Sequence, residues 1–450
     1  MKRLRILIIP VIMQFSGATS GIKWQSTLED IKKQGKLVVL TRESPATLYY
    51  ENNQTKGFEY ELTQQLADSL AVDVEYKLYD NPSELMTALA NGDGHIAAPG
   101  LSVANTGHLG FQLGPGYKDV NLKVVCNKKF KLPDHDMHLA QHSLLVIANS
   151  AQEHKLQALK QQLPELTWDT ADATPADVLQ KIDQGDYQCT VIDSSLLKLH
   201  RPHYPNLVEA YTTDQAKLSW LLPQDADNLN AHLHTWLKRA KHQSTLSTLN
   251  ERYFGFTDIY DYYDTVVFKQ RIKKRLPKYL NHFRQVASDY QLPWALLASI
   301  AYQESQWNPH AISPTGVRGL MMLTKSTARE LGIVNRTNPK LSIRGGAKYL
   351  KRMLKQTAPE IDPNDRMWFA LAAYNAGAGH VRDARKLARK LGKNPNVWAD
   401  VKEVFPLLSQ RRYFTKLKHG YARGHEPVRY IDRIRLYHRI LNHSLQAAAV

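Results

Sequence analysis

The stretch Ala301-Tyr-Gln-Glu-Ser-Gln-Trp-Asn-Pro-His-Ala-Ile-Ser-Pro-Thr-Gly-Val-Arg-Gly-Leu-Met-Met-Leu-Thr324 joins an apolar helical pattern to a turn rich in proline and glycine. Leu297, Ile300, Ala301 and Glu304 lie three or four positions apart, so Glu304 is expected on the apolar face at the end of a helix. Apolar surroundings favour the neutral form of a carboxyl group and raise its pKa toward the range of a general acid. Most helical glutamates are solvated surface groups, so the prediction of a catalytic Glu304 depends on the residues that follow it.

Those residues predict a turn that faces the carboxyl group. Two prolines and two glycines break the helix and permit a tight turn: Pro309, Pro314, Gly316 and Gly319. Thr324 can then cap another helix, which ends at Gly332. A helix-end carboxyl group opposite a turn lined by backbone groups is an arrangement that exposes a neutral sugar to an acid.

A second cluster, Ala372-Ala-Tyr-Asn-Ala-Gly377, places a phenol and an amide beside a glycine that would close a helix. An ordinary helix C-cap would explain the glycine alone. Glu-Ser at 304–305, Gly-Leu-Met at 319–321, this cluster and Glu426-x-x-x-Tyr-Ile431 follow one another in an order and spacing that resemble the lytic transglycosylase catalytic domain, a relative of goose-type lysozymes. The resemblance covers about residues 270–443.

The resemblance implies a mainly α, lysozyme-like domain that cleaves the β-1,4 bond between MurNAc and GlcNAc of peptidoglycan and leaves 1,6-anhydro ends. It implies that Glu304 is the catalytic residue. It also implies a set of residues that bind the glycan strand: Ser313, Met321, Met322, Tyr374, Asn375 and Tyr430. Many relatives have Gln where this chain has Met322.

The distribution of acidic residues favours the same chemistry. A glycosidase that uses water needs two carboxyl groups. The first acidic residue after Glu304 is Glu330, and neither cluster contains another Asp or Glu. One carboxyl group would then protonate the glycosidic oxygen and afterwards take the proton of the C6 hydroxyl, which replaces water. A distant acid such as Asp383 would instead make the protein an ordinary hydrolase, and a receptor that only holds glycan is the third alternative.

Residues 34–255 alternate between strand and helix patterns. Strands are predicted at 35–41, 72–79, 95–99, 122–126, 144–149 and 189–192, and helices at 57–70, 83–90, 153–163 and 175–183. The alternation predicts a bilobed α/β clamp with mainly parallel sheets. The wording Gly35-x-Leu-x-Val, Gly57-Phe-Glu-Tyr-Glu-Leu62 and Glu84-Leu-Met-x-Ala-Leu-x-x-Gly92 is similar to bacterial extracellular solute-binding proteins of the amino-acid-binding type. Residues 102–109 lack the arginine with which such proteins clamp a ligand carboxylate, and we expect a cell-wall peptide as ligand.

The first residues are typical of a secretory signal peptide, with an amphipathic anchor as the alternative. Lys2, Arg3 and Arg5 precede a short apolar run, and small residues follow at 16–18. We expect a signal peptide at 1–21, a solute-binding-protein-like domain at 22–263 and a catalytic domain at 264–450. Cys126 and Cys189 either pair or remain buried thiols.

The formal net charge of +17 is unevenly distributed, with 34 basic and 11 acidic side chains in residues 265–450 against 25 and 31 in residues 1–264. Such a positive module attracts a polyanion. Nucleic acid is excluded because no nucleic-acid-binding motif accompanies the charge and the signal peptide directs export. We expect a periplasmic protein that binds glycan strands and is peripherally attached to the inner face of the outer membrane. No metal and no cofactor is expected, since the 18 histidines form no ligand-spaced pair with a general base.

Overall fold

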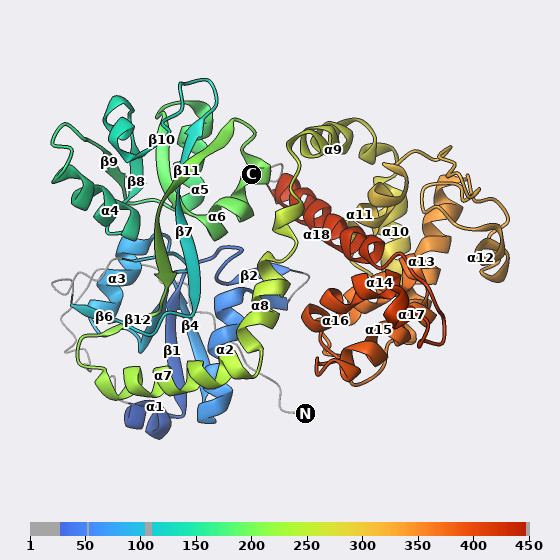
Figure 1. The fold of residues 1–450 in the computed structure, drawn as a ribbon, viewed down its shortest axis with the longest axis horizontal. Coiled ribbons are helices and arrows are strands. Elements are labelled where there is room, and N and C mark those ends of the chain that lie inside the picture. The colour runs from blue at the N-terminus through green and yellow to red at the C-terminus, as the bar shows by residue number, and fades with distance from the viewer. Residues whose placement is uncertain (1–27, 52–53, 104–109, 447–450) are drawn as a thin grey trace. The chain divides into compact units, whose positions relative to one another are not determined.

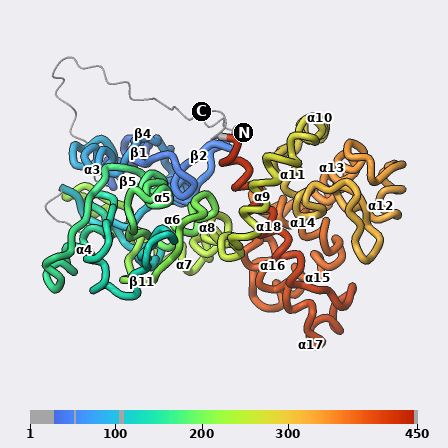
Figure 2. Tube along the Cα trace, turned by 90° about the horizontal axis from the view of Figure 1, so that it is seen from above, coloured from blue at the N-terminus to red at the C-terminus, as the bar shows by residue number. Residues whose placement is uncertain are grey.

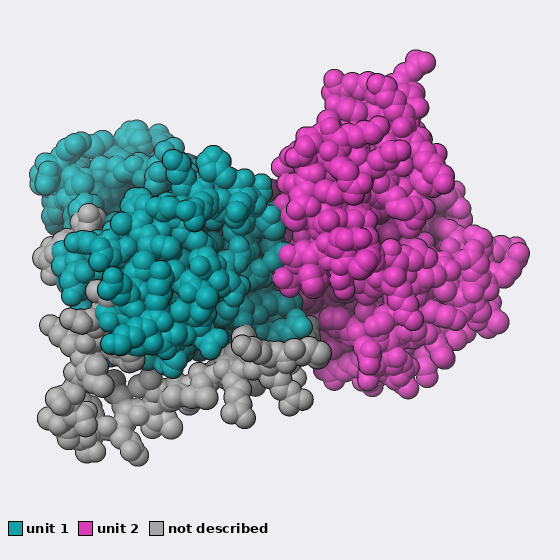
Figure 3. Space-filling model, turned by 90° about the horizontal axis from the view of Figure 1, so that it is seen from below, with its two compact units in different colours: residues 1–254 teal, residues 255–450 magenta. Residues whose placement is uncertain are grey.

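The computed structural model describes residues 28–51, 54–103 and 110–446 (Figure 1). The predicted signal peptide lies outside the described residues. The chain forms two compact units, Met1–Phe254 and Gly255–Val450 (Figure 3). The sequence placed the junction at 263/264, within helix α9 (Tyr262–Lys274). The division falls earlier because Phe256 already packs in the same core as Phe268 of α9.

The first lobe of unit 1 contains a five-stranded sheet in the order β4-β1-β5-β12-β6. β1 (Lys36–Thr41) pairs in parallel with β4 (Asp73–Leu78) and β5 (Ile96–Ala98), as the alternation of strands and helices predicted. β12 (Leu221–Pro223) pairs antiparallel with β5, and β6 (Phe111–Leu113) at the edge pairs antiparallel with β12. All residues of β1 after Lys36 are buried, which is typical of a central strand covered on both faces.

The second lobe corrects the expectation of mainly parallel sheets. Its three-stranded sheet has the order β10-β7-β11, and β7 (Lys118–Asn127) pairs antiparallel with both β10 (Cys189–Asp193) and β11 (Leu207–Leu218). β8 (Leu145–Ile147) and β9 (Asp169–Ala171) pair in parallel, and a parallel bridge links Leu144 to Cys189. Strand direction is antiparallel because the chain enters this lobe along β7 and leaves it along β11, which the sequence pattern did not reveal as a strand.

A disulfide between Cys126 and Cys189 joins β7 to β10. The two residues are directly opposite each other in the antiparallel register. The sequence had left open whether they pair.

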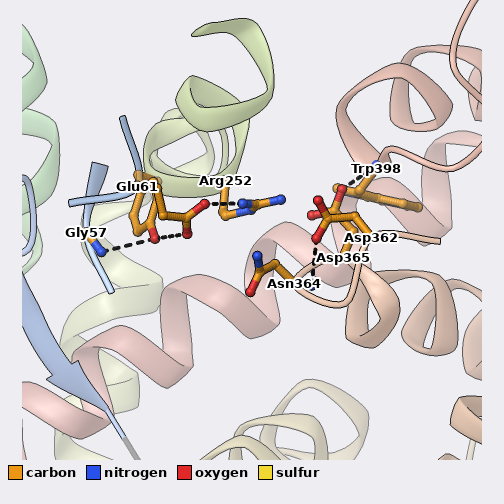
Figure 4. A network of polar contacts seen from close by, with 8 residues as sticks. Gly57, Glu61, Arg252, Asp362, Asn364, Asp365 and Trp398 are labelled. Carbon is orange, nitrogen blue, oxygen red and sulfur yellow. Dashed lines mark hydrogen bonds and ion pairs between the residues drawn. The ribbon is translucent and has the colours of Figure 1, made fainter. Parts of the chain in front are cut away.

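The remaining elements of unit 1 are a short hairpin and helices around the sheets. They are β2 (Tyr49–Glu51), β3 (Gln54–Lys56), α1 (Leu28–Gln34), α2 (Phe58–Leu70), α3 (Pro82–Ala90), α4 (Ala151–Lys160), α5 (Pro175–Gln184), α6 (Ser194–His200), α7 (Asp227–His242) and α8 (Thr245–Phe254). α8 is tied to α2 by an ion pair between Arg252 and Glu61, and the Tyr253 hydroxyl accepts the Gly57 amide at 3.0 Å (Figure 4).

The two lobes of unit 1 are joined by a buried polar contact. Asp193, at the end of β10 in the second lobe, accepts the Ser102 amide at 2.8 Å and the Ser102 hydroxyl at 2.5 Å. Ser102 follows β5 in the first lobe. Gln152 of α4 donates to the same carboxylate at 2.8 Å, and all three residues are buried. The lobes are therefore closed on each other at this point.

Unit 2 is built from helices. In addition to α9 they are α10 (Leu280–Tyr290), α11 (Trp294–Ser305), α12 (Lys325–Glu330), α13 (Pro339–Lys355), α14 (Arg366–Ala376), α15 (Ala378–Lys390), α16 (Trp398–Val404), α17 (Arg411–Phe414) and α18 (His425–Gln446). α11 is the central helix and lies beside α18 in both views (Figures 1 and 2). The predicted mainly α domain is thus confirmed.

Two local features hold the helices of unit 2 in place. The Trp307 indole donates to the Ala298 carbonyl at 2.8 Å and is buried, which folds the chain back after α11. The buried Asp365 carboxylate accepts the Trp398 amide at 2.8 Å at the start of α16 (Figure 4). Among the described helices, none combines the length and the apolar character needed to cross a membrane.

Candidate active site

Glu304 lies in the last turn of α11 with its side chain partly buried. The Tyr430 hydroxyl, from α18, donates to its Oε1 at 2.6 Å. Burial raises the pKa of Glu304 to about 7, while the hydrogen bond from Tyr430 acts in the opposite direction. At neutral pH the carboxyl group is therefore divided between a form that can give a proton and a form that can accept one.

Tyr374, from α14, completes a group of three side chains brought together by three helices. Its hydroxyl donates to the Met321 carbonyl at 3.2 Å, and its ring meets Tyr349 of α13 edge-on at 5.0 Å between centroids. Burial and then the charge of Glu304 raise the pKa values of both Tyr374 and Tyr430. Both phenols therefore remain protonated. The Tyr430 hydroxyl donates to Glu304 and the Tyr374 hydroxyl to the Met321 carbonyl, and each phenol oxygen can still accept a hydrogen bond.

The predicted turn after α11 is present, and contacts within the turn hold it in shape. Ser313 Oγ accepts the Val317 amide at 3.2 Å and shares a hydrogen bond with Thr315 Oγ1 at 2.9 Å. Isolated bridges link Ile312 to Arg318 and Arg318 to Leu323. The hydroxyl of Ser313 is thus already used to shape the turn.

Met321, which is predicted to bind the glycan strand, has no exposed surface. Its side chain packs on Gly346 of α13, where an added Cβ would lie 2.4 Å from the Met321 Cε. Its carbonyl faces Tyr374, and its amide donates to Ser342 Oγ at 3.1 Å. The neighbouring Met322 is partly exposed and has a φ of 44°, in the left-handed region.

Asn375 is exposed at the end of α14, next to Tyr374. Gly377, with a φ of 91°, ends α14 and begins α15, which gives the glycine a structural role beside the polar pair.

Asp383 was the candidate second acid. It is buried on α15, and its Oδ2 accepts the His419 amide at 2.7 Å. Its carboxylate therefore supports a loop. The influences on the Glu304 pKa are burial and Tyr430, and neither is an acidic residue.

Sequence reasoning missed three supporting residues. Ser305 Oγ donates to the Leu320 carbonyl at 2.9 Å and fixes the turn onto α11; its signal was the Glu-Ser pair itself. Ser342 and Tyr349 come from α13, and no local pattern connects them to Glu304.

Unit 1 contains a separate cavity of ≈ 570 Å³ between its lobes. The first lobe contributes Asp80 and Asn81, and the second contributes residues around α5, which include Asp172, Asp177 and Lys181. Arg42, buried after β1, donates to the Pro99 carbonyl at 2.8 Å. Burial lowers its pKa to about 10, and the charge of Asp177 acts against this.

Comparison with known proteins finds a matching family for a stretch of each unit. Residues 281–397 match the transglycosylase SLT domain, and residues 37–256 match the bacterial extracellular solute-binding proteins, family 3. A solved structure of a mutant ArgBP from T. maritima is similar to 51% of this chain and 99% of that chain, with 17% identity and a TM-score of 0.45.

Three similar curated proteins are each described as a membrane-bound lytic murein transglycosylase F. The protein of Ectopseudomonas mendocina is 38% identical over 97% of this chain and 90% of its own length. That of Pseudomonas fluorescens is 39% identical over 97% and 90%, and that of Pseudomonas putida is 40% identical over 92% and 87%.

Proposed function

The chain belongs to the family of membrane-bound lytic murein transglycosylases F, and on this premise we propose that Glu304 acts alone as acid and base in cleaving the glycan strand of peptidoglycan. The protein is a lytic murein transglycosylase. The observation that carries the proposal is the Glu304 carboxyl group, raised to a pKa of about 7 by burial and held by the Tyr430 hydroxyl.

The proposed reaction has two proton transfers. Neutral Glu304 first gives its proton to the oxygen between MurNAc and GlcNAc, and the bond from that oxygen to C1 of MurNAc breaks. The carboxylate then takes the proton of the C6 hydroxyl of the same MurNAc, whose oxygen forms a bond to C1. The products are a 1,6-anhydro end and a free GlcNAc hydroxyl, and Glu304 is neutral again, so no water is consumed.

The other site residues hold the reactants. Tyr430 orients the carboxyl group through its hydrogen bond, and Tyr374 presents a phenol beside it. Asn375 and Met322 offer exposed or partly exposed surface to the sugars, while Ser313 and Met321 keep the turn in shape. The two phenol oxygens, as acceptors, and the carboxyl group offer polar contacts to a neutral sugar.

Substitution of the catalytic group tests the mechanism. Glu304→Gln keeps the shape but removes the titratable proton, so turnover of purified sacculi should fall by about 10²–10⁴ while glycan binding survives. Glu403→Gln is the matched control, because Glu403 is exposed on α16 and pairs with Lys393. Near-normal turnover by folded Glu304→Gln would contradict the proposal.

The mass of the products separates this reaction from hydrolysis. Intramolecular attack gives anhydro ends, which are lighter by one water than the reducing ends of a hydrolase. The engagement of Asp383 with His419 supports the anhydro product. Reducing ends released by the wild-type protein would favour the alternative, a lysozyme-like hydrolase.

The relatives are membrane-bound by name, and we propose for this chain a periplasmic location with peripheral attachment to the inner face of the outer membrane. The surplus of 34 basic over 11 acidic side chains in residues 265–450 supports attachment to anionic phosphates. Membranes washed with concentrated salt should release the protein. Retention until detergent is added would argue against a purely electrostatic attachment.

For unit 1 we propose a cell-wall peptide as ligand and an effect of that peptide on access to Glu304. The cavity lined by Asp80, Asp172 and Asp177 favours a ligand that offers amino groups. Calorimetric titration of Glu304→Gln protein with stem peptides, with and without glycan, measures the coupling, which is typically about 1–3 kcal/mol and must be equal in both directions. Identical peptide affinity in both titrations, with unchanged turnover, would make unit 1 a tether.

A further inference from the structure

Three side chains on the surface of the second lobe form a compact set of potential metal ligands: Asp134, His135 and His138. One ligand atom from each lies within 4.8 Å of the others. They belong to the connection between β7 and β8. We propose that they bind one divalent transition-metal ion of the Zn²⁺ type.

The distances between the ligand atoms suit such an ion. Asp134 Oδ1 lies 2.7 Å from His138 Nδ1 and 3.7 Å from His135 Nε2. A tetrahedral ion with bonds of about 2.0–2.1 Å keeps its ligand atoms about 3.3 Å apart. These two separations bracket that value, and the third, between the two imidazole nitrogens, is at most 4.8 Å.

The ligand types suit it as well. Two imidazole nitrogens and one carboxylate oxygen are a set that Zn²⁺, Cu²⁺ and Ni²⁺ accept, whereas Mg²⁺ and Ca²⁺ prefer oxygen alone. Three protein ligands leave a fourth position for water or an external group.

The backbone that carries the ligands is fixed before any ion arrives. The His138 amide donates to the His135 carbonyl at 3.1 Å, in a 3-10 turn that runs from Asp136 to Gln141 and places both rings on one side. The rings lie 4.0 Å apart between centroids. Two further contacts hold this turn to the lobe: Thr213 of β11 donates to Asp136 at 2.5 Å, and Leu139 is buried in the core.

Metal titration of the full chain, first treated with a chelator, tests the proposal. With Co²⁺ as an optical probe and Zn²⁺ in calorimetry, we expect saturable binding that weakens at least tenfold in His135→Ala and in His138→Ala. His154→Ala is the matched control, because His154 is an exposed histidine of α4 outside the set and its removal should leave the affinity unchanged. Ions bound elsewhere contribute equally to all four proteins.

Electron paramagnetic resonance of bound Cu²⁺ gives a second readout. The parent protein should show coupling to two imidazole nitrogens, and each histidine variant should lose one of them. Unchanged affinity and unchanged spectra in both His135→Ala and His138→Ala would overturn the proposal. So would an equal loss of affinity in His154→Ala.

Discussion

The Glu304 carboxyl group must be neutral when it meets the glycosidic oxygen. Because its pKa is about 7, the neutral fraction falls roughly tenfold for each pH unit above that value. We therefore predict that kcat/KM on a soluble glycan is nearly constant below about pH 7 and declines above it. A pH–rate profile that rises between pH 7 and pH 9 would contradict an acid role for this group.

Tyr430 acts on the same titration through its hydrogen bond to Oε1. Tyr430→Phe keeps the buried ring but removes a contact that lowers the pKa of Glu304, so the alkaline limb of the profile should move to higher pH. Turnover should also fall, since the carboxyl group loses its orientation. Tyr421→Phe, at an exposed tyrosine, is the control and should leave both the limb and the rate unchanged.

The same pKa predicts how stability depends on pH. A carboxyl group whose folded pKa is about 7 and whose ordinary pKa is 4.5 gives the folded state an extra proton between these values, so stability is lost as pH rises through this window. Glu304→Gln lacks this dependence. In urea unfolding, the free energy of unfolding of Glu304→Gln relative to that of the parent should therefore rise by up to about 1.4 kcal/mol for each pH unit across the window.

Glu59 does not disturb this comparison. Burial also raises its pKa to about 7, but the parent and the variant share it, so its effect cancels in the difference. A difference between the two proteins that stays constant from about pH 4.5 to about pH 7 would show that Glu304 is not shifted.

Individual side chains also show where sequence reasoning reaches its limit. The spacing of residues 297–304 predicted that Glu304 lies on the apolar face of a helix end, and α11 confirms it. The run Leu320-Met-Met-Leu323 could not show which methionine faces the core, because the small residue that admits Met321 is Gly346 on another helix. Ordinary helical periodicity carries no information about such partners.

The parallel strands of the first lobe were predictable because helices lie between β1, β4 and β5 in the sequence, and such crossovers are typical of parallel neighbours. In the second lobe the strands near 122–126 and 189–192 were found, but β11 was missed, since most of its residues are partly or fully exposed and lack a clear alternation. Without β11 the antiparallel direction of this sheet could not be inferred.

The disulfide between β7 and β10 should stabilise this lobe measurably. It closes a loop of 63 residues, and removing such a link usually costs about 2–4 kcal/mol. Cys126→Ala combined with Cys189→Ala should lower the transition temperature of unit 1 in calorimetry, and a reductant should do the same to the parent. If a reductant lowered the transition temperature of the double variant as much as that of the parent, the reductant would be acting on something other than this disulfide.

The two units differ in charge, and the basic surplus of residues 265–450 includes exposed side chains along α15. We predict that replacing Arg382, Lys386 and Arg389 together by Gln weakens binding to sacculi and reduces its salt dependence. Turnover of a short soluble glycan should be unchanged, because these residues are exposed and Asp383 and Ala384 hold the buried face of the helix. If binding to sacculi depended equally on salt in the parent and in the triple variant, other basic residues would be responsible for the electrostatic attraction.

The contact of Asp193 with Ser102 and Gln152 has a consequence for any molecule that enters the cavity of unit 1. These hydrogen bonds join the two lobes, so a ligand that enters the cavity only when the lobes separate has to wait until they break. The apparent dissociation constant then exceeds the intrinsic one by the inverse of the open fraction. A receptor with such a contact would respond at higher ligand concentrations than one whose lobes separate without breaking it.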